Sequence, residues 1–587
     1  MEFALRTQYL YLLMVGDMRC SVFSPFDTVP FDPERACTFG LAPGGVMSAP
    51  RRADYRQVYL VQPKFPPSYW GLESMLRLTP FRAVTPPLGL LTLAALTPPE
   101  YRVTLCDENA GERVDYDTSA QIVGITGYNL QNARVFAHAQ RFRARGKTVV
   151  LGGPLANSLP EQCRAYCDVL FQGEAEYAWP RFLREYARGR WDDHYVQEDK
   201  IHLPDSPPPR LDLLRSRYLL GIVQCTRGCP FTCEFCDIIV VYGRKMRFKP
   251  IPQVLQEVQA WQRHGMGQVF FADDNFVGHR AYARELLREL AAWNSRQHRP
   301  LSFFTQLSID VVRDPELLGL LRDANFAAVF IGVETPRKAS LAETHKTQNE
   351  RVDLVEAIHT IQSYNLFIWA GMIVGFDHDD AGIFDEQFEF LQKAQIPVAM
   401  LSVLLAIPGT PLYKRLEAEG RLLPEMTAGP ALPLDLEHDE HLHWEGTDGR
   451  TNFRPLRLTM EELRHGQKRL YQRLYSPAAF RQRLMGNLRR FGHVRFRPER
   501  IRWELVSSFL RLAYHNWRQG PSARGFFWGS LLTTLRHSPR SFIPINMQLG
   551  MYEHFAQVHA EAWSWNPWKS EPEQDSMAKP TANAVNG

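Results

Sequence analysis

Three cysteines, Cys229, Cys233 and Cys236, lie close together with the spacing Cys-x-x-x-Cys-x-x-Cys. Cysteine thiolates are the usual ligands of iron–sulfur clusters, most of which take four of them. Three thiolates on one loop can bind three irons of a cubane and leave the fourth iron for an external ligand. An open position of this kind distinguishes a catalytic metal site from a closed structural one, by analogy with zinc. The spacing therefore predicts a [4Fe–4S] cluster and one-electron redox chemistry, with these cysteines as the metal ligands.

Two other interpretations of the cysteines stay open. A structural zinc site needs four ligands, commonly in paired Cys-x-x-Cys units, so Cys225 would have to supply the fourth. Alternatively, the cysteines are buried and inert. The chain has 9 cysteines, an odd and mostly scattered set. Such a set does not resemble a disulfide framework and favours a reducing compartment.

The stretch from Gly228 to Lys245 resembles the radical S-adenosylmethionine (radical SAM) superfamily, and within it the enzymes with an N-terminal cobalamin-binding domain. The resemblance extends over about residues 56–475. It implies that the reduced cluster passes one electron to S-adenosylmethionine at the open iron, which yields methionine and a 5′-deoxyadenosyl radical. That radical removes hydrogen from an unactivated carbon. Cobalamin as methyl carrier then implies a C-methyltransferase, in which the cofactors supply the difficult chemistry.

The resemblance leaves the outcome of the reaction open. Relatives with the same two domains also perform rearrangement, cyclisation or oxidation without net methyl transfer, and a gain of one methylene in the product separates the two outcomes. A non-catalytic corrinoid or iron–sulfur sensor is an alternative of another class. As an enzyme, the protein is expected to act on a small-molecule or lipid substrate and to use an electron donor such as flavodoxin or ferredoxin.

The elements after residue 201 are those of a barrel. A short strand leads into the cysteine loop, and further strands are expected at 268–272, 302–306, 327–333, 368–375 and 399–406. Helical segments separate them at 252–264, 281–294, 315–323, 351–364 and 383–394. Six βα units are fewer than the eight of a closed barrel, so we expect a partial (βα)6 TIM-type barrel over residues 201–424. Active sites of such barrels lie at the carboxyl ends of the strands.

Polar residues and glycines at the ends of these strands match the needs of S-adenosylmethionine. The resemblance suggests that Asp273, Asp274 and Asn275 accept hydrogen bonds from its ammonium and that Glu334 takes a ribose hydroxyl or a polar substrate group. Gly371, Ile373 and Gly375 lie in a segment that resembles the family's strand beside adenine. Pro408 lies in a segment that resembles the turn after the family's last barrel strand, and these four residues are the remaining candidates for binding the cofactor. Each has a structural alternative, because Asp-Asp-Asn is a frequent helix cap and glycines relieve crowding inside a barrel.

Residues 56–200 alternate strands and helices, which implies a parallel, doubly wound, Rossmann-like α/β domain. We expect strands at 58–62, 101–106, 121–126, 147–151 and 169–171. Ligands of such sheets bind beyond the carboxyl ends of the strands. The candidates there for cobalamin binding are Asp107, Asn109, Thr126, Gly152 and Gly153, although tight turns would also explain them. The unit lacks Gly-x-Gly-x-x-Gly, which argues against a dinucleotide, and lacks the Asp-x-His-x-x-Gly motif whose histidine ligates cobalt.

The region 425–568 is expected to be mainly helical and resembles an extension of unknown function that relatives of the hopanoid methylases carry. Arginines alternate with aromatic residues from Arg481 to Arg540. A basic, aromatic helical surface suits an anionic membrane, whereas the alternative is packing of the aromatic residues on the barrel. The acidic and histidine-rich run 434–443 suggests either a solvated linker or metal binding.

Composition agrees with a soluble protein of several domains. The chain has 587 residues, is 45% apolar and carries a formal net charge of +4, which gives no reason to expect nucleic-acid binding. No stretch reaches the ~18 apolar residues of a spanning helix, so we expect a cytoplasmic protein, with peripheral association to the inner membrane face as a further hypothesis. Residues 1–55 are interpreted as a disordered or wrongly assigned leader and 569–587 as a disordered tail.

Overall fold

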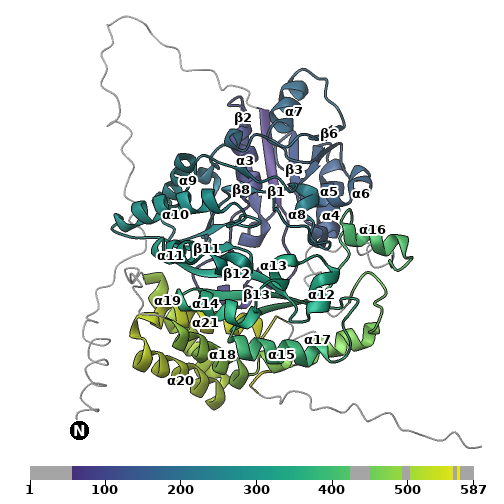
Figure 1. Ribbon diagram of the computed structural model, residues 1–587. Coiled ribbons are helices and arrows are strands. Elements are labelled where there is room, and N and C mark those ends of the chain that lie inside the picture. The colour runs from purple at the N-terminus through teal and green to yellow at the C-terminus, as the bar shows by residue number, and fades with distance from the viewer. Residues whose placement is uncertain (1–55, 424–449, 492–502, 559–562, 564, 569–587) are drawn as a thin grey trace, which may run out of the picture. The chain divides into compact units, whose positions relative to one another are not determined.

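The computed structural model describes residues 56–423, 450–491, 503–558, 563 and 565–568 (Figure 1). The expectations for residues 1–55, 434–443 and 569–587 lie outside the described residues. Among the described helices, none combines the length and apolar character needed to cross a membrane.

The first α/β unit is built on a six-stranded parallel sheet with the order β2-β1-β3-β4-β5-β6. Its strands are β1 (Arg56–Gln62), β2 (Tyr101–Asp107), β3 (Ile122–Thr126), β4 (Thr148–Gly152), β5 (Val169–Gln172) and β6 (His194–Val196). The five expected strands are present, and β6 is an addition. Because the strand order reverses beside β1, the crevice beyond the ends of β1 and β3 is the topological switch point where such sheets bind ligands.

Both faces of this sheet are covered by helices. Along β1, Val58 and Leu60 enter one hydrophobic core, whereas Tyr59 and Val61 enter the other. This double burial is why the strands read as continuous apolar runs. The covering helices are α3 (Leu88–Leu96) and α7 (Ala178–Ala187) on one face, and α4 (Asn132–Arg143), α5 (Pro154–Ser158) and α6 (Pro160–Arg164) on the other.

The second sheet is also parallel, and its strand order β14-β13-β12-β11-β10-β7 follows the chain. The strands are β7 (Gly221–Val223), β10 (Gln268–Phe271), β11 (Ser302–Gln306), β12 (Phe326–Glu334), β13 (Phe367–Val374) and β14 (Val398–Val403). The helices between them are α9 (Ile251–Arg263), α10 (Arg280–Ser295), α11 (Pro315–Asp323), α14 (Leu354–Ser363) and α15 (Ile383–Ala394). The first and last strands do not pair, so the six βα units form the expected open barrel.

A short antiparallel pair, β8 (Thr226–Arg227) and β9 (Arg247–Phe248), flanks the cysteine loop and was not expected. Two short helices on the same side of the barrel are α12 (Lys338–Glu343) and α13 (Thr347–Glu350). Two hydrogen bonds join this side to the loop, since Glu234 donates its N–H to the Thr344 carbonyl over 3.1 Å and Gln348 donates to the Cys233 sulfur over 3.6 Å.

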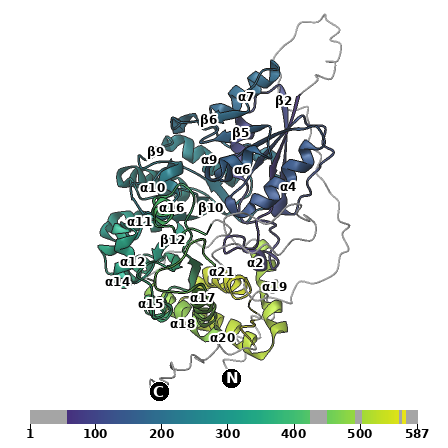
Figure 2. The same cartoon turned by 90° about the vertical axis from the view of Figure 1, so that its right-hand side faces the viewer.

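The C-terminal region is helical, as expected. It comprises α17 (Met460–Leu474), α18 (Pro477–Arg490), α19 (Trp503–Gln519), α20 (Pro521–His537) and α21 (Phe542–Phe555), with the last three in yellow tones in Figure 2, whereas α16 (Pro411–Ala418) precedes it and follows the last strand of the barrel. Part of its aromatic content packs on the barrel: the Tyr475 hydroxyl donates to the Ala399 carbonyl over 2.7 Å, and Arg483, fully buried, donates to the Ile396 carbonyl over 2.7 Å. Within the stretch from Arg481 to Arg540, the packing alternative therefore holds for α18.

Candidate active site

The cysteine loop carries its three thiols between β8 and the short helix α8 (Ile238–Val241). Cys233 is buried, and Cys229 and Cys236 are half-buried. Burial raises the pKa of the Cys229 thiol, and it raises the pKa of Cys236 to about 12. Thiolates at such positions need a nearby cation. Within the described residues, no group of three or more His, Cys, Asp or Glu side chains is placed to hold a single metal ion.

Cys225 lies at the base of this loop and is fully buried. Its sulfur is 3.1 Å from both carboxylate oxygens of Asp273. Cys225 therefore contacts Asp273, and it lies between β7 and β8 and outside both strands.

The Asp-Asp-Asn segment after β10 holds the backbone of the cysteine loop. Asp273 is fully buried and accepts the amide N–H of Thr226. Asp274 accepts the N–H of Gly228 over 2.9 Å, and burial raises the pKa of its carboxyl to about 7. Asn275 accepts the N–H of Ser308 over 3.3 Å. The Asp273 carboxylate thus binds other groups of the protein. Asp274 binds the loop as well, but it also lines a large cavity.

Glu334 ends β12 in the left-handed conformation, with φ at 65°. Its carboxylate is 2.5 Å from the Lys346 ammonium, which also lies 5.7 Å from the centre of the Phe235 ring in the cysteine loop. Burial lowers the pKa of Lys346, but the charge of Glu334 and the thiols of Cys233 and Cys236 outweigh it and raise the pKa above its ordinary value. The strained backbone of Glu334 is of the kind that persists at functional sites. The sequence analysis names Glu334 as a candidate and does not name Lys346, its partner in the ion pair.

The other barrel candidates fall into two groups. A Cβ at Gly371 would lie 2.8 Å from the Phe330 ring, so this glycine relieves crowding between β12 and β13. Gly375 has φ at 98° and donates its N–H to Asp379 over 2.9 Å, and the side chain of Ile373 packs in a small apolar cluster with Phe235. Pro408 differs because it lines the cavity.

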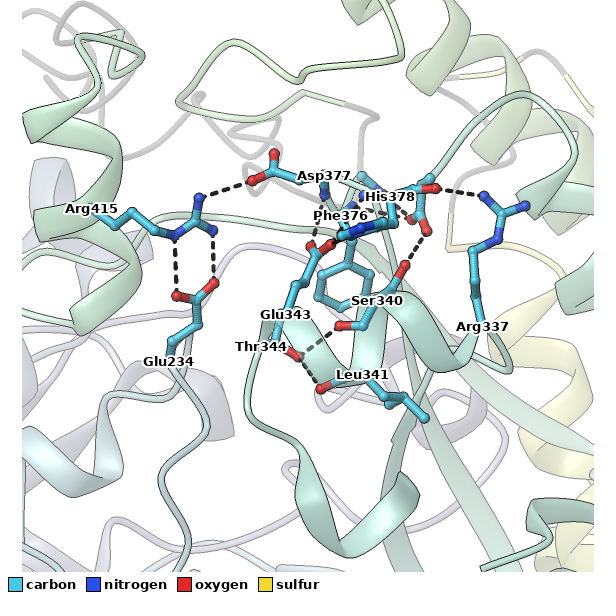
Figure 3. Close-up of polar contacts among 12 residues, drawn as sticks. Glu234, Arg337, Ser340, Leu341, Glu343, Thr344, Phe376, Asp377, His378 and Arg415 are labelled. Carbon is cyan, nitrogen blue, oxygen red and sulfur yellow. Dashed lines mark hydrogen bonds and ion pairs between the residues drawn. The ribbon is translucent and has the colours of Figure 1, made fainter. Parts of the chain in front are cut away.

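A polar network braces the loop from the side of α16 (Figure 3). Glu234, which follows Cys233, is almost completely buried and receives two hydrogen bonds of 2.8 and 3.2 Å from the Arg415 guanidinium. Arg415 also donates to Asp377 over 2.9 Å. Glu343 accepts the backbone N–H groups of Asp377 and His378 over 2.8 and 3.1 Å. Sequence reasoning missed this network, whose one local signal is an acidic residue inside the cysteine motif.

A cavity of about 2020 Å³ connects the carboxyl ends of both sheets. Small-molecule pockets usually have about 300–1,000 Å³, so this one has room for more than one ligand. Residues of both sheets and of the C-terminal region line it; among them are Thr126, Gly153, Asp237, Asp274, Pro408, His515 and Trp568.

All five residues proposed for cobalamin line this cavity. Gly153 has φ at 85°, and a Cβ there would lie 2.3 Å from the Thr126 hydroxyl oxygen. Asp107 is nearly inaccessible to solvent and accepts hydrogen bonds of 3.0 Å from the Tyr218 hydroxyl and from the backbone N–H of Asn109. Gly153 therefore lies in close contact with Thr126 at the edge of the cavity, whereas Asp107 ties the first unit to the start of the barrel.

Buried ion pairs link the cysteine loop to the first sheet. Arg227 pairs with Glu174 at 2.7 Å and Glu176 at 2.6 Å, both just beyond β5. Arg247 of β9 pairs with the same Glu174 at 2.8 Å. The loop is consequently fixed with respect to the end of the first sheet.

At the wall that the C-terminal region contributes, buried His554 lies beside the partly exposed Glu73. The His554 ring nitrogen Nε2 lies 3.0 Å from the Ser68 carbonyl, and its Nδ1 lies 3.7 Å from the Glu73 carboxylate. Burial raises the pKa of Glu73 to about 7 and lowers the pKa of His554 to about 4. Both residues line the cavity.

Two family models match the chain. Residues 223–391 match the radical SAM superfamily, and residues 410–564 match a domain of unknown function, DUF4070.

Relatives match over most of the chain. An uncharacterized methyltransferase of Synechocystis sp. is 34% identical over 511 residues, covering 85% of this chain and 91% of the relative. The hopanoid C-2 methylase of Rhodopseudomonas palustris is 32% identical over 393 residues, covering 66% and 74%. Among solved structures, the cobalamin-dependent S-adenosylmethionine radical enzyme OxsB, with aqua-cobalamin and S-adenosylmethionine bound, matches with a TM-score of 0.53 and 15% identity over 87% of this chain and 81% of that one. At this identity, the likeness to OxsB concerns the fold.

Proposed function

This chain belongs to the radical SAM superfamily of enzymes, and from that premise we propose that it is a cobalamin-dependent C-methyltransferase acting on an unactivated carbon of a small-molecule or lipid substrate. The observation that carries the proposal is the large cavity, because it joins the ends of two sheets that suit two different cofactors. The methyltransferase relatives favour methyl transfer over rearrangement or oxidation.

The cysteine loop suits a [4Fe–4S] cluster held by Cys229, Cys233 and Cys236. Three thiols on one loop form a donor set of the right chemistry. When bound, the cluster supplies one electron for the cleavage of S-adenosylmethionine. The protein's own part is to fix the loop through Asp273, Asp274 and Glu234. Lys346 adds a positive charge beside the thiols, which favours their ionised form.

S-adenosylmethionine is assigned to the cavity beside this loop. Asp274 and the backbone at Pro408 face the cavity, and they are proposed to receive its polar groups. Glu334 is proposed to act together with Lys346, since the two side chains share one ion pair at the end of β12. Gly371, Ile373 and Gly375 are proposed to shape the adjacent strand, because their contacts are with protein atoms.

Cobalamin is assigned to the end of the first sheet. Gly152, Gly153 and Thr126 line the cavity there, and they are proposed to face a large planar ligand because the two glycines let it approach the backbone closely. Asp107 and Asn109 are proposed to keep that surface in place. When bound, cobalamin supplies a methyl group to the substrate. The electron for the cluster is proposed to come from a protein such as flavodoxin or ferredoxin in the cytoplasm.

The test of this proposal is methyl transfer itself. The full chain is reconstituted without oxygen with iron, sulfide and hydroxocobalamin, and incubated with reductant, membrane-lipid extract and S-adenosylmethionine carrying a deuterated methyl group. Mass spectrometry is expected to find products that carry the labelled methyl group. Formation of 5′-deoxyadenosine with substrate consumption but without label would favour rearrangement or oxidation instead.

A further inference from the structure

The outer side of α19 carries a stripe of exposed apolar residues. Trp503, Leu510, Tyr514 and Trp517 are 74%, 52%, 64% and 59% exposed. Their separations of seven, four and three positions place them on one side of the helix. The opposite side is the one that packs, because Leu512 and Asn516 are buried. A contiguous apolar patch on the surface indicates an interaction site.

The neighbouring helix continues this patch. Trp528, Leu532 and Leu535 of α20 are also exposed and share one side of their helix. The Arg524 guanidinium lies 4.6 Å from the centre of the Trp517 ring, and the rings of Phe509 and Trp528 are 6.2 Å apart. The two helices run side by side in both views (Figures 1 and 2). The seven exposed apolar residues of α19 and α20 form what we call the α19–α20 face.

Charge around the α19–α20 face is almost entirely positive. The segment 503–541 contains one acidic residue, Glu504, and five arginines: Arg511, Arg518, Arg524, Arg536 and Arg540. Four of these arginines are exposed, and Arg524 is half-buried. Helical geometry puts Arg511 and Arg518 beside the aromatic stripe. Tryptophan and tyrosine favour the boundary between headgroups and acyl chains, and arginine favours the phosphate groups of anionic lipids.

We propose that the α19–α20 face docks on the surface of an anionic membrane. A second copy of the chain is a poorer occupant, because a two-fold contact would place the same arginines opposite each other. An anionic membrane surface offers both kinds of contact: the aromatic rings can enter the boundary between headgroups and acyl chains, and the arginines can bind the phosphate groups.

The same helix also borders the cavity. Arg511, His515 and Gln519 of α19, four residues apart, line it. The docked protein thus has a single helix between the lipid phase and the cavity, which gives an apolar lipid substrate a short path inward. This substrate route rests on the proposed function, whereas the docking itself does not.

Flotation of the full reconstituted chain with vesicles tests the docking. We expect the protein to float with vesicles of phosphatidylcholine and phosphatidylglycerol, and to float less with phosphatidylcholine alone or at high salt. The triple variant Trp503→Ala/Tyr514→Ala/Trp517→Ala should lose flotation. Arg518→Gln and Arg536→Gln should each lower the partition coefficient roughly fivefold.

Matched controls come from the first α/β unit. Trp191→Ala removes an exposed aromatic residue, and Arg188→Gln/Arg190→Gln removes two exposed arginines, and both variants should float like the wild type. Iron content and melting temperature report whether each variant is folded. The proposal is wrong if the wild type stays at the bottom with anionic vesicles, or if the triple variant floats unchanged. It is also wrong if the triple substitution only converts a dimer to a monomer. A chain that floats but yields no labelled product would instead refute the methyltransferase proposal.

Discussion

The ion pair between Arg415 and Glu234 is one of the buried polar constraints on the cysteine loop. The two side chains meet in the two-bond geometry of a guanidinium and a carboxylate, and the Glu234 side chain is 6% exposed. Removal of Arg415 would leave a buried carboxylate without its partner, which costs ~3–5 kcal/mol in fully buried pairs. Because the Arg415 side chain is 33% exposed, we expect the lower end of that range. Arg415→Gln is therefore predicted to lower the free energy of unfolding in urea and to lower the iron content after reconstitution.

Two further variants identify the cause of that loss. Arg181→Gln removes a more exposed ion pair with Glu185 and should change stability by less than about 0.5 kcal/mol. Glu234→Gln combined with Arg415→Gln should recover part of the loss, since the buried charge is then gone. An Arg415→Gln protein with wild-type stability and iron content would show that the pair does not support the loop.

At the scale of residues, features within a short stretch of sequence can be predicted, whereas contacts between residues far apart in the chain cannot. The spacing of the cysteines is a property of eight consecutive residues, so it is visible without structure. Arg415 is separated from Glu234 by 181 positions, and nothing in the local pattern around either residue indicates the other. The role of Asp273 could not be predicted for a similar reason. A sequence motif does not distinguish a carboxylate that binds a ligand from one that binds the backbone of the cysteine loop.

At the scale of elements, the turn after β4 makes a specific prediction. Gly153 has φ at 85° and ψ at −167°, a region that is nearly closed to other residues, and a Cβ there would meet the Thr126 hydroxyl. Gly153→Ala should therefore cost ~1–3 kcal/mol of stability and should weaken retention of hydroxocobalamin in gel filtration.

Gly146, which follows α4, is the matched control for this variant. It also has a positive φ, of 70°, but a Cβ there would have no atom within 4 Å. Gly146→Ala should cost ~1 kcal/mol and leave corrinoid retention unchanged. If both variants retain the same amount of hydroxocobalamin, the turn at Gly153 does not belong to the proposed cobalamin site.

The contact between α21 and the segment before α3 predicts an unusual pH dependence. Because the pKa of Glu73 rises to about 7 on folding, Glu73 makes the protein less stable as pH increases from about 4.5 to 7. Because the pKa of His554 falls to about 4, His554 makes it more stable as pH increases from about 4 to 6.5. The two effects oppose each other between about pH 4.5 and 6.5.

Urea unfolding of the protein without cofactors between pH 4.5 and 7.5 separates these two effects. In the Glu73→Gln variant only the effect of His554 remains, so the free energy of unfolding should rise with pH more steeply than in the wild type. In the His554→Gln variant only the effect of Glu73 remains, so the free energy of unfolding should fall as pH rises. His298→Gln, which changes an exposed histidine on the barrel, serves as the control. Curves parallel to the wild type for both variants would contradict the assignment.

Five strands of the first sheet, and the strands of the second sheet with the five helices between them, could be predicted because regular apolar patterns indicate them, whereas α5, α6 and α7 were not among the expected helices. The strands β6, β8 and β9 could not, since two or three residues carry no usable period. For α19, the sequence showed arginines and aromatic residues but not which of them pack, because that depends on neighbours distant in the chain.

At the scale of the whole molecule, the two α/β units are joined by buried contacts and share one cavity. Glu174 and Glu176 at the end of the first sheet hold Arg227 of the cysteine loop, and Tyr218 holds Asp107. One cavity extends along these contacts. No sequence pattern predicts such a cavity, because its walls come from segments hundreds of residues apart. The sheets were predictable from the sequence, whereas their common cavity was not.

The most direct test of the central claim is the yield of 5′-deoxyadenosine from S-adenosylmethionine by the anaerobically reconstituted chain under a strong reductant. The account predicts a brown wild-type protein with about four irons that forms 5′-deoxyadenosine. Cys233→Ala is predicted to lose both the colour and the product, whereas Cys163→Ala, which alters a buried cysteine of the first unit, keeps them. Cleavage of S-adenosylmethionine by the Cys233→Ala variant, or a colourless wild type loaded with zinc, would contradict the account.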